Sequence, residues 1–407
     1  MRIALSLLLF TIPLMVLSCA PKPKPFATAS VEQLPTVVIF VPGYKGSVLV
    51  EEHGHIAWVT VWDALFNGRT LRLPNPDAGL RGTPLRASSV LHNVTALFGA
   101  YSVDIYGSLL SQLTEAISPN VEVSSLPYDW RQSNIVTVGL LAERVAQKRR
   151  AGAKRIVLVG HSMGGLVVSY YLRYGAQLPS AAIDNWEGAR AVDAAVIAGV
   201  PFQGSVKVFR DMQTGAKTLY NRTLLDAEAL SSFPSTYELL PARPDGVVSN
   251  DYLDVLDPEL WIQRSLGLLR NCAAAECAQR ASFTRRVLTE TRSFRERLSA
   301  PPSQETRPMD FPLLSITCID RTTESIFRER DDGSFDWKNP EFANGDEIVS
   351  AASSTLPTAY QRALSVQELR VKSPHERLLV DEVAFPEMLR FLSKNAHPVG
   401  SPLAATE

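Results

Sequence analysis

The chain has 407 residues, of which 45% are hydrophobic and 20% are charged, and its mean hydropathy is close to zero. These values exclude a disordered chain and a polytopic membrane protein. The 41 basic and 42 acidic residues give a net charge of −1 without a long basic run, so nucleic acid is not an expected partner. The length allows one large α/β domain with an insertion, or two ordinary domains.

The N-terminus is typical of an export signal rather than of a folded domain. Arg2 precedes a mostly apolar stretch over 3–18, which is shorter than the ~20 residues of a membrane span. The stretch ends in Val-Leu-Ser before Cys19, and this pattern resembles the lipobox of bacterial lipoproteins. An ordinary signal peptide with an incidental cysteine is the alternative. The resemblance implies a signal peptide over 1–18, acylation of Cys19, and anchoring at the outer membrane facing the periplasm. A Pro-rich tether is expected over 19–35.

Alternating strands and helices follow in chain order. We expect strands over 37–41, 121–126, 155–159, 194–200 and 312–320, and helices over 106–117, 135–150, 165–174 and 379–393. Residues 51–95 are predicted to be irregular, and residues 205–308 to be helical pieces and loops without a clear strand. This order predicts an α/β fold with a mainly parallel central sheet and helices on both faces. The core is expected over 36–204 and 309–394, with a cap inserted at 205–308 and a tail over 395–407.

The main chemical signal is Gly-His-Ser-Met-Gly-Gly at 160–165, directly between a predicted strand and a predicted helix. A serine in so sharp a turn adopts strained backbone angles, and a Cβ at Gly160 or Gly164 would collide with the adjoining strand or helix. A plain glycine-rich turn or a phosphate-binding loop is the alternative, although the motif lacks the Gly-Lys-Ser/Thr ending of the latter. Ser162 is the candidate nucleophile.

A nucleophilic serine needs a base and an acid, which follow it in the chain order Ser, Asp, His. Sorting the six histidines by position leaves His375, in a loop just ahead of the C-terminal helix, as the candidate base. A purely structural histidine is the alternative. Asp320, at the end of a predicted strand, and Asp346, in a Gly-Asp turn, are the two candidate acids. The acid would accept the Nδ1–H of the imidazole and fix its tautomer.

Four motifs together resemble one family. They are Val-Pro-Gly-Tyr-Lys-Gly-Ser at 41–47, Pro-Tyr-Asp-Trp-Arg at 127–131, the serine motif at 160–165 and Gly-Asp-Glu-Ile-Val at 345–349. Their order and spacing resemble the lecithin:cholesterol acyltransferase-like family of α/β-hydrolases, and residues 233–241 resemble its cap motif. The resemblance covers most of residues 36–393 and favours Asp346 as the acid. Glu347 and Ile348 depart from the usual Gly-Asp-(Gly/Asp)-Thr-Val, which changes packing around the acid but keeps the acid itself.

The resemblance also implies an oxyanion hole. Two backbone N–H groups, those of Tyr44 and Met163, would donate to the developing oxyanion. In the family, the region that contains Trp58 and Trp62 faces the membrane, so both side chains are candidate lipid contacts. A place in the core is the alternative for these apolar residues.

Tyr128 and Arg131 lie at the end of a predicted strand beside the expected site, and they are candidate substrate contacts. A structural reading, in which Asp129 pairs with Arg131 and Trp130 packs, is equally open.

The redox state expected for the remaining three cysteines follows from the exported location. An exported protein permits a disulfide between Cys272 and Cys277, with Cys318 as a buried thiol in a strand. No cofactor and no metal are expected, because no Cys or His is paired at ligand spacing except His53 and His55 in a polar turn.

These features predict a membrane-anchored serine acyl hydrolase or acyltransferase that acts on ester lipids, with phospholipids as the expected substrates. Its expected partners are the lipid substrate and the membrane surface. A general carboxylesterase or triacylglycerol lipase on the same fold is the enzyme alternative. A lipoprotein that binds lipid without turnover is the non-catalytic alternative, and the complete Ser-His-Asp set speaks against it.

The lipobox-like pattern predicts that Cys19→Ser abolishes membrane retention without destroying the catalytic fold, because the Pro-rich tether separates the anchor from the first strand. Cell fractionation and the N-terminal mass of the wild-type protein measure the effect. Equal retention of the variant, with no lipid mass on the wild type, would contradict the prediction.

Overall fold

A parallel sheet of six strands, in the order β16-β13-β9-β8-β1-β7, supports the fold. The computed structural model describes residues 36–60, 68–96, 101–117, 121–218, 220–303 and 308–396. The strands are β1 Thr36–Val41, β7 Val121–Ser125, β8 Arg155–His161, β9 Ala194–Ala198, β13 Pro312–Cys318 and β16 Ser365–Val371. The five predicted strands are confirmed. The edge strand β16 was not predicted, because the exposed polar residues Gln367, Glu368 and Arg370 interrupt its apolar pattern in the sequence.

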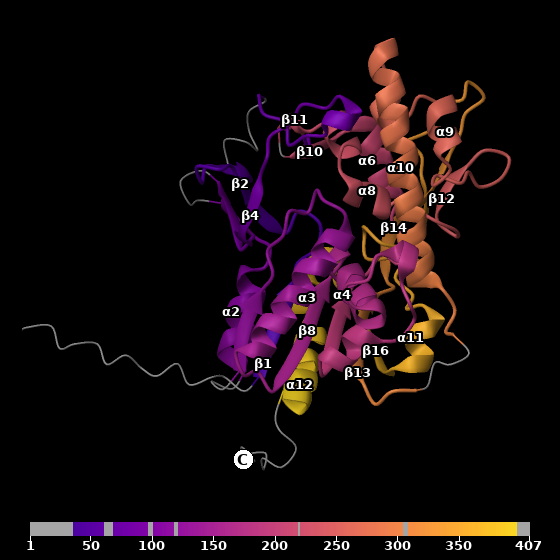
Figure 1. Cartoon of the computed structure of the whole chain (residues 1–407). Helices are drawn as coiled ribbons and strands as arrows, with labels where there is room; N and C mark the ends of the chain where they lie inside the picture. Colours follow the sequence, from indigo (N-terminus) through magenta and orange to yellow (C-terminus); the bar gives the residue numbers. More distant parts are fainter. Residues whose placement is uncertain are drawn as a thin grey trace, which may run out of the picture. The chain divides into compact units, whose positions relative to one another are not determined.

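Helices cover both faces of this sheet, as predicted (Figure 1). Along β1, Val37 and Ile39 pack into one core with α3 and α4, whereas Val38 and Phe40 pack into a second core with α2 and α12. Burial on both faces explains why the strand is continuously apolar. The helices are α2 Gly107–Ala116, α3 Asn134–Arg150, α4 Met163–Tyr174, α5 Glu187–Ala191, α11 Thr358–Ala363 and α12 Ala384–Ala396.

The segment expected to be irregular contains several short strands. Strands β3 Ile56–Trp58, β2 Ser47–Val50 and β4 Arg86–Val90 form an antiparallel sheet in that order, and β5 Asn93–Ala96 pairs with β6 Tyr101–Asp104. The expectation of irregular structure over 51–95 therefore misses these strands, although most of the other described residues of the segment are irregular. Strands of three to five residues are too short to give a readable alternation.

The segment predicted to be a cap contains helices and also strands. The helices are α6 Val206–Thr214, α7 Ala227–Ser231, α8 Pro234–Glu238, α9 Pro258–Gln263 and α10 Ala274–Ser299. The strands are β10 Ala216–Thr218, β11 Asn221–Leu225 and β12 Gly246–Val248, so the expectation of no clear strand is wrong. Strand β12 pairs with β14 Arg321–Arg328, which pairs with β15 Glu341–Gly345. This small sheet crosses the boundary predicted at 308/309, and a covering role for residues 205–308 stays a prediction.

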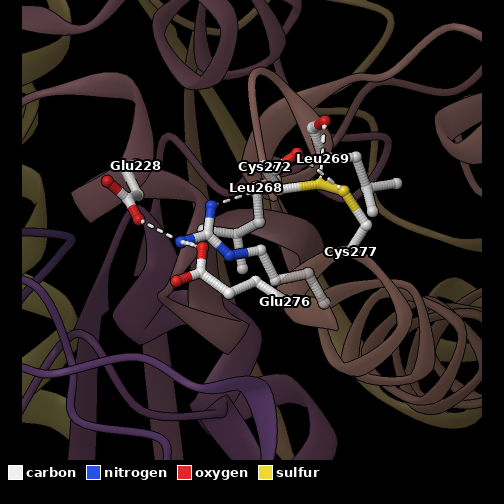
Figure 2. The surroundings of a disulfide bond; sticks show 7 residues. Glu228, Leu268, Leu269, Cys272, Glu276 and Cys277 are labelled. Atoms are coloured by element: carbon white, nitrogen blue, oxygen red, sulfur yellow. Dashed lines mark hydrogen bonds and ion pairs between the residues drawn. A yellow bond between two sulfur atoms is a disulfide. The ribbon is translucent and has the colours of Figure 1, made fainter. Parts of the chain in front are cut away.

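A disulfide joins Cys272 and Cys277 at the start of α10 (Figure 2). The Cα atoms are 5.3 Å apart, within the usual range for a disulfide. Beside it, the guanidinium of Arg280 donates to the backbone carbonyl of Leu268 at 3.0 Å and pairs with Glu228 of α7 at 2.9 Å. These contacts hold the first turns of α10 against α7. Cys318 is a free, buried thiol on β13.

None of the helices in the described residues has both the length and the apolar character that crossing a membrane requires. The predicted signal peptide, the predicted acylation site at Cys19 and the predicted tether lie outside the described residues, as does Trp62.

Candidate active site

The nucleophile candidate sits at a strained turn between β8 and α4. Ser162 has a φ of 54°, a region that non-glycine residues rarely adopt. A Cβ on Gly164 would lie 2.3 Å from the carbonyl oxygen of Val41, and one on Gly160 would lie 2.9 Å from the carbonyl oxygen of Gly164. The predicted collisions are confirmed. The absent side chains allow β1, β8 and α4 to approach closely enough to form the turn.

The structure brings Ser162, His375 and Asp346 together in one hydrogen-bonded chain. The Nε2 atom of His375 lies 2.8 Å from the Oγ of Ser162, and its Nδ1 lies 2.7 Å from the Oδ2 of Asp346. His375 and Asp346 are both buried. In addition, the backbone N–H of His375 donates to the backbone carbonyl of Asp346 at 2.9 Å. The geometry allows Nδ1–H to donate to the carboxylate, which leaves the Nε2 lone pair for the serine hydroxyl.

Asp320 does not reach the imidazole. Its carboxylate pairs with the ammonium of Lys372 at 3.2 Å, and 44% of its side chain is exposed. Asp346 is therefore the acid that contacts His375.

The pKa values of the pair move apart. Burial alone lowers the pKa of His375, but the charge of Asp346 and its hydrogen bond outweigh burial and raise it above its ordinary value of 6.5. Burial alone raises the pKa of Asp346. The charge and hydrogen bond of His375, with the N–H groups of Val349 and Ile348, leave that pKa below its ordinary value. The aspartate is thus ionised whenever the imidazole is neutral.

The loop that carries Asp346 is held by residues from distant segments. The Oδ1 of Asp346 accepts hydrogen bonds from the N–H groups of Ile348 at 3.0 Å and Val349 at 2.7 Å, which directs Oδ2 toward His375. The hydroxyl of Ser205 donates to the carbonyl of Ile348 at 2.6 Å. The buried Asp245 accepts hydrogen bonds from the hydroxyls of Ser325 and Ser350. Sequence reasoning missed these supports, and no motif marks them.

Glu347 also lies in this loop, with a φ of 82°. This is the position at which the sequence departs from the family's Gly or Asp. Its N–H donates to the hydroxyl of Thr323 at 2.9 Å, and its carboxylate pairs with Arg321 at 2.9 Å. These contacts hold Glu347 in a backbone conformation that glycine adopts without strain.

The two predicted oxyanion donors flank the nucleophile. Met163 is the first residue of α4, where a helix leaves its N–H groups without intrahelical acceptors. Tyr44 lies in the turn between β1 and β2, directly after Gly43, where a Cβ would lie 2.9 Å from the Cβ of Ser162. Trp58 is buried, and its indole N–H donates to the carbonyl of Lys45 at 2.9 Å, so it supports the same turn.

The contacts of Tyr128 and Arg131 are those of the structural alternative. The guanidinium of Arg131 forms a bidentate ion pair with Asp129, with N–O distances of 2.9 and 2.7 Å, and donates a hydrogen bond to the carbonyl of Leu71 at 3.1 Å. The hydroxyl of Tyr128 donates to the carbonyl of Pro42 at 2.7 Å. Both side chains are fully buried. Tyr128 braces the turn after β1, and Arg131 ties Asp129 to the segment that contains Leu71, so neither side chain presents a free polar group to a substrate.

The parallel sheet, the strained serine turn and the Ser-His-Asp chain define an α/β-hydrolase. A chain in the crystal structure of the Tle4–Tli4 complex aligns with a TM-score of 0.54 at 13% identity, over 89% of this chain and 98% of that one. The sequence model of the lecithin:cholesterol acyltransferase family matches residues 56–284, more than half of the chain. The protein therefore belongs to this family.

Two curated relatives align over part of their lengths. An uncharacterized protein of Saccharomyces cerevisiae is 24% identical over 258 residues, which are 60% of this chain and 36% of that protein. Phospholipase A(1) LCAT3 of Arabidopsis thaliana is 28% identical over 137 residues, which are 29% of this chain and 27% of that enzyme. The chain thus spans about a third of the length of the curated relatives it matches.

The raised pKa of His375 predicts a pH dependence. Only the neutral imidazole can accept the proton of Ser162, so kcat should rise with pH and its acidic limb should lie above pH 6.5. Asp346→Asn removes the group that raises this pKa and leaves burial to lower it, so the limb should move to lower pH. The maximal rate should fall by about 10⁴-fold, because the wrong tautomer is held. Asp320→Asn is the matched control and should leave both unchanged. A greater loss in the control than in Asp346→Asn, at equal folded yield, would reverse the assignment.

Proposed function

We propose that the protein is a serine acyl hydrolase or acyltransferase of ester lipids, with Ser162 as its nucleophile. The observation that carries the proposal is the unbroken chain of hydrogen bonds from Asp346 through His375 to Ser162 at the strained turn. Membership of the family and the alignment with the Arabidopsis phospholipase A(1) support ester lipids as the substrate class.

The geometry suits a two-step acyl transfer. The Oγ of Ser162 attacks the ester carbonyl carbon while Nε2 of His375 takes its proton, and Asp346 stabilises the imidazolium. The N–H groups of Tyr44 and Met163 donate to the tetrahedral oxyanion. The bond to the leaving alcohol then breaks, and His375 returns the proton to that alcohol. Water or a second alcohol attacks the acyl-serine, with His375 again as base. The bond between the acyl carbon and Oγ of Ser162 then breaks, His375 returns the proton to Ser162, and these steps need no cofactor.

A lysine beside the oxyanion turn supports phospholipids as substrates. Lys45 lies two residues after Gly43, and its half-buried ammonium lies 5.0 Å from the ring centroid of Tyr44. None of the ion pairs among the described residues uses Lys45, and the neighbouring carboxylate of Asp211 already pairs with Lys207 at 2.9 Å. Burial lowers the pKa of Lys45 to about 8, so the group is still mainly charged at pH 7. An uncommitted cation at this place suits the phosphate of a phospholipid.

We also propose that acylation at Cys19 anchors the protein to the outer membrane facing the periplasm. The lipobox-like pattern and the Pro-rich segment after it support this location.

Replacing the nucleophile should abolish turnover without unfolding the protein. Ser162→Ala is expected to lower kcat by about 10⁴–10⁶-fold and to prevent labelling by a fluorophosphonate probe. Ser169→Ala, at a buried serine on α4, is the matched control and should keep both turnover and labelling by the probe. Residual esterase activity within about tenfold of wild type, at an unchanged Tm, would refute the nucleophile assignment.

Replacing Lys45 should separate phospholipids from neutral esters. Lys45→Met is expected to lower kcat/KM on phospholipid vesicles by about 10–100-fold, the usual cost of a lost charged hydrogen bond, with little effect on a long-chain neutral ester. Lys154→Met is the matched control, because Lys154 precedes the amino-terminal end of β8, whereas Ser162 follows its carboxyl-terminal end. Equal losses on both substrates would argue against phosphate recognition and favour the carboxylesterase or triacylglycerol lipase alternative.

A further inference from the structure

A second chain of buried hydrogen bonds runs behind the catalytic one. The backbone N–H of Gly43 donates to the hydroxyl oxygen of Tyr106 at 3.0 Å, and that oxygen lies 2.7 Å from Nδ1 of His161. The Nε2 of His161 lies 2.9 Å from the backbone carbonyl oxygen of His375. Tyr106 and His161 are both buried, and neither takes part in the catalytic chain.

Each proton in this second chain has one possible place. The carbonyl oxygen of His375 can only accept, so Nε2 of His161 carries a hydrogen. Burial, aided by the charge of His375, lowers the pKa of His161 to about 3, so the ring is neutral and its Nδ1 is a bare acceptor. Burial also raises the pKa of Tyr106, which keeps its hydroxyl protonated. Tyr106 therefore donates to His161 while it accepts from Gly43. All three hydrogen bonds then run in one direction, from the N–H of Gly43 to the carbonyl of His375.

The chain connects three parts of the active site that come from distant segments. Gly43 precedes the oxyanion donor Tyr44, and a Cβ on Gly43 would lie 3.3 Å from Nδ1 of His161 and 2.9 Å from the Cβ of Ser162. His161 is the residue before the nucleophile. The third part is His375. Its backbone carbonyl is hydrogen-bonded to His161, while its ring is hydrogen-bonded to Asp346.

Packing alone does not require these polar side chains. A phenylalanine and a leucine would fill similar space without needing partners, whereas each buried polar atom costs free energy unless it is hydrogen-bonded. The ring of Tyr106 already packs against Phe40, with centroids 4.9 Å apart, and this contact needs no hydroxyl. What the hydroxyl and the imidazole add is a fixed direction and distance between the parts they join.

We propose that Tyr106 and His161 are positioning residues for acyl transfer, which set the oxyanion turn at Gly43 relative to the Ser162–His375 pair. The inference rests on the proposed function, since it assigns the donors and the base that the chain aligns. The two residues touch neither substrate nor reacting atoms. They act by holding the N–H of Tyr44 and the imidazole of His375 at the same time in the places that the tetrahedral intermediate needs.

The deciding variant is Tyr106→Phe, which removes the hydroxyl and keeps the ring. Gly43 and His161 then lose their shared partner, so kcat on a soluble ester should fall by about 10–100-fold with little change in KM. The acidic limb of the pH profile should stay in place, because the contact between Asp346 and His375 is intact. His161→Asn should cause a similar loss. The double variant should be no worse than either single one, since both break the same chain.

Tyr174→Phe is the matched control. Tyr174 is also buried, and its hydroxyl donates to the carbonyl of Arg297 at 2.9 Å. It lies at the far end of α4 from Ser162, roughly 18 Å away by helical rise. The two tyrosine variants should lower Tm to a similar extent, but only Tyr106→Phe should lower kcat.

Wild-type kcat in Tyr106→Phe, or equal losses of kcat in both tyrosine variants, would overturn the positioning role. Additive losses in the double variant with His161→Asn would also overturn it. Full activity of Ser162→Ala would instead sink the proposed function, so the two failures are distinguishable.

Discussion

The active site depends on one close approach, in which β1, β8 and the start of α4 meet around Ser162. The left-handed backbone at Ser162 costs about 1–3 kcal/mol, and it persists only where the surroundings leave no alternative. All twelve residues of α4 are buried, and six of the seven residues of β8 are buried as well. Relaxing the turn would pull these elements out of the core. The burial of apolar surface therefore maintains the strain that presents the nucleophile.

The acid Asp346 lies beyond two further strands rather than at the end of a strand of the central sheet. Asp320, two residues after the end of the core strand β13, pairs with Lys372 and does not contact the imidazole. Between it and Asp346 the chain makes β14 and β15, which pair with each other while β14 pairs with β12 from the insertion. Asp245, next to β12, accepts from Ser325 and from Ser350 of the acid loop. The insertion thus takes part in placing the acid as well as extending the molecule beyond the core.

Two buried histidines lie side by side in opposite electrostatic settings. The ring centroids of His161 and His375 are 5.0 Å apart. Only His375 has a carboxylate partner, which raises its pKa, whereas burial and the charge of His375 lower the pKa of His161. A neutral neighbour lets His375 gain and lose a proton without competition from a second titrating ring. Burial of both rings and one well-placed aspartate suffice to create this difference.

The amino-acid sequence alone determined five of the six strands of the central sheet, the helices α2, α3, α4 and α12, the nucleophile turn and the family resemblance. It did so because β-branched runs, glycine spacing and rare motif strings are local signals. It also named His375 and Asp346, partly through the family resemblance. Only the tertiary structure decided which aspartate meets the imidazole, that Arg131 and Tyr128 brace the fold, and that Tyr106 contacts His161. Those facts depend on contacts between residues far apart in the chain, and such contacts leave no periodic or local pattern. The short antiparallel strands escaped prediction for a related reason, since their stability comes from partners elsewhere in the chain rather than from their own few residues.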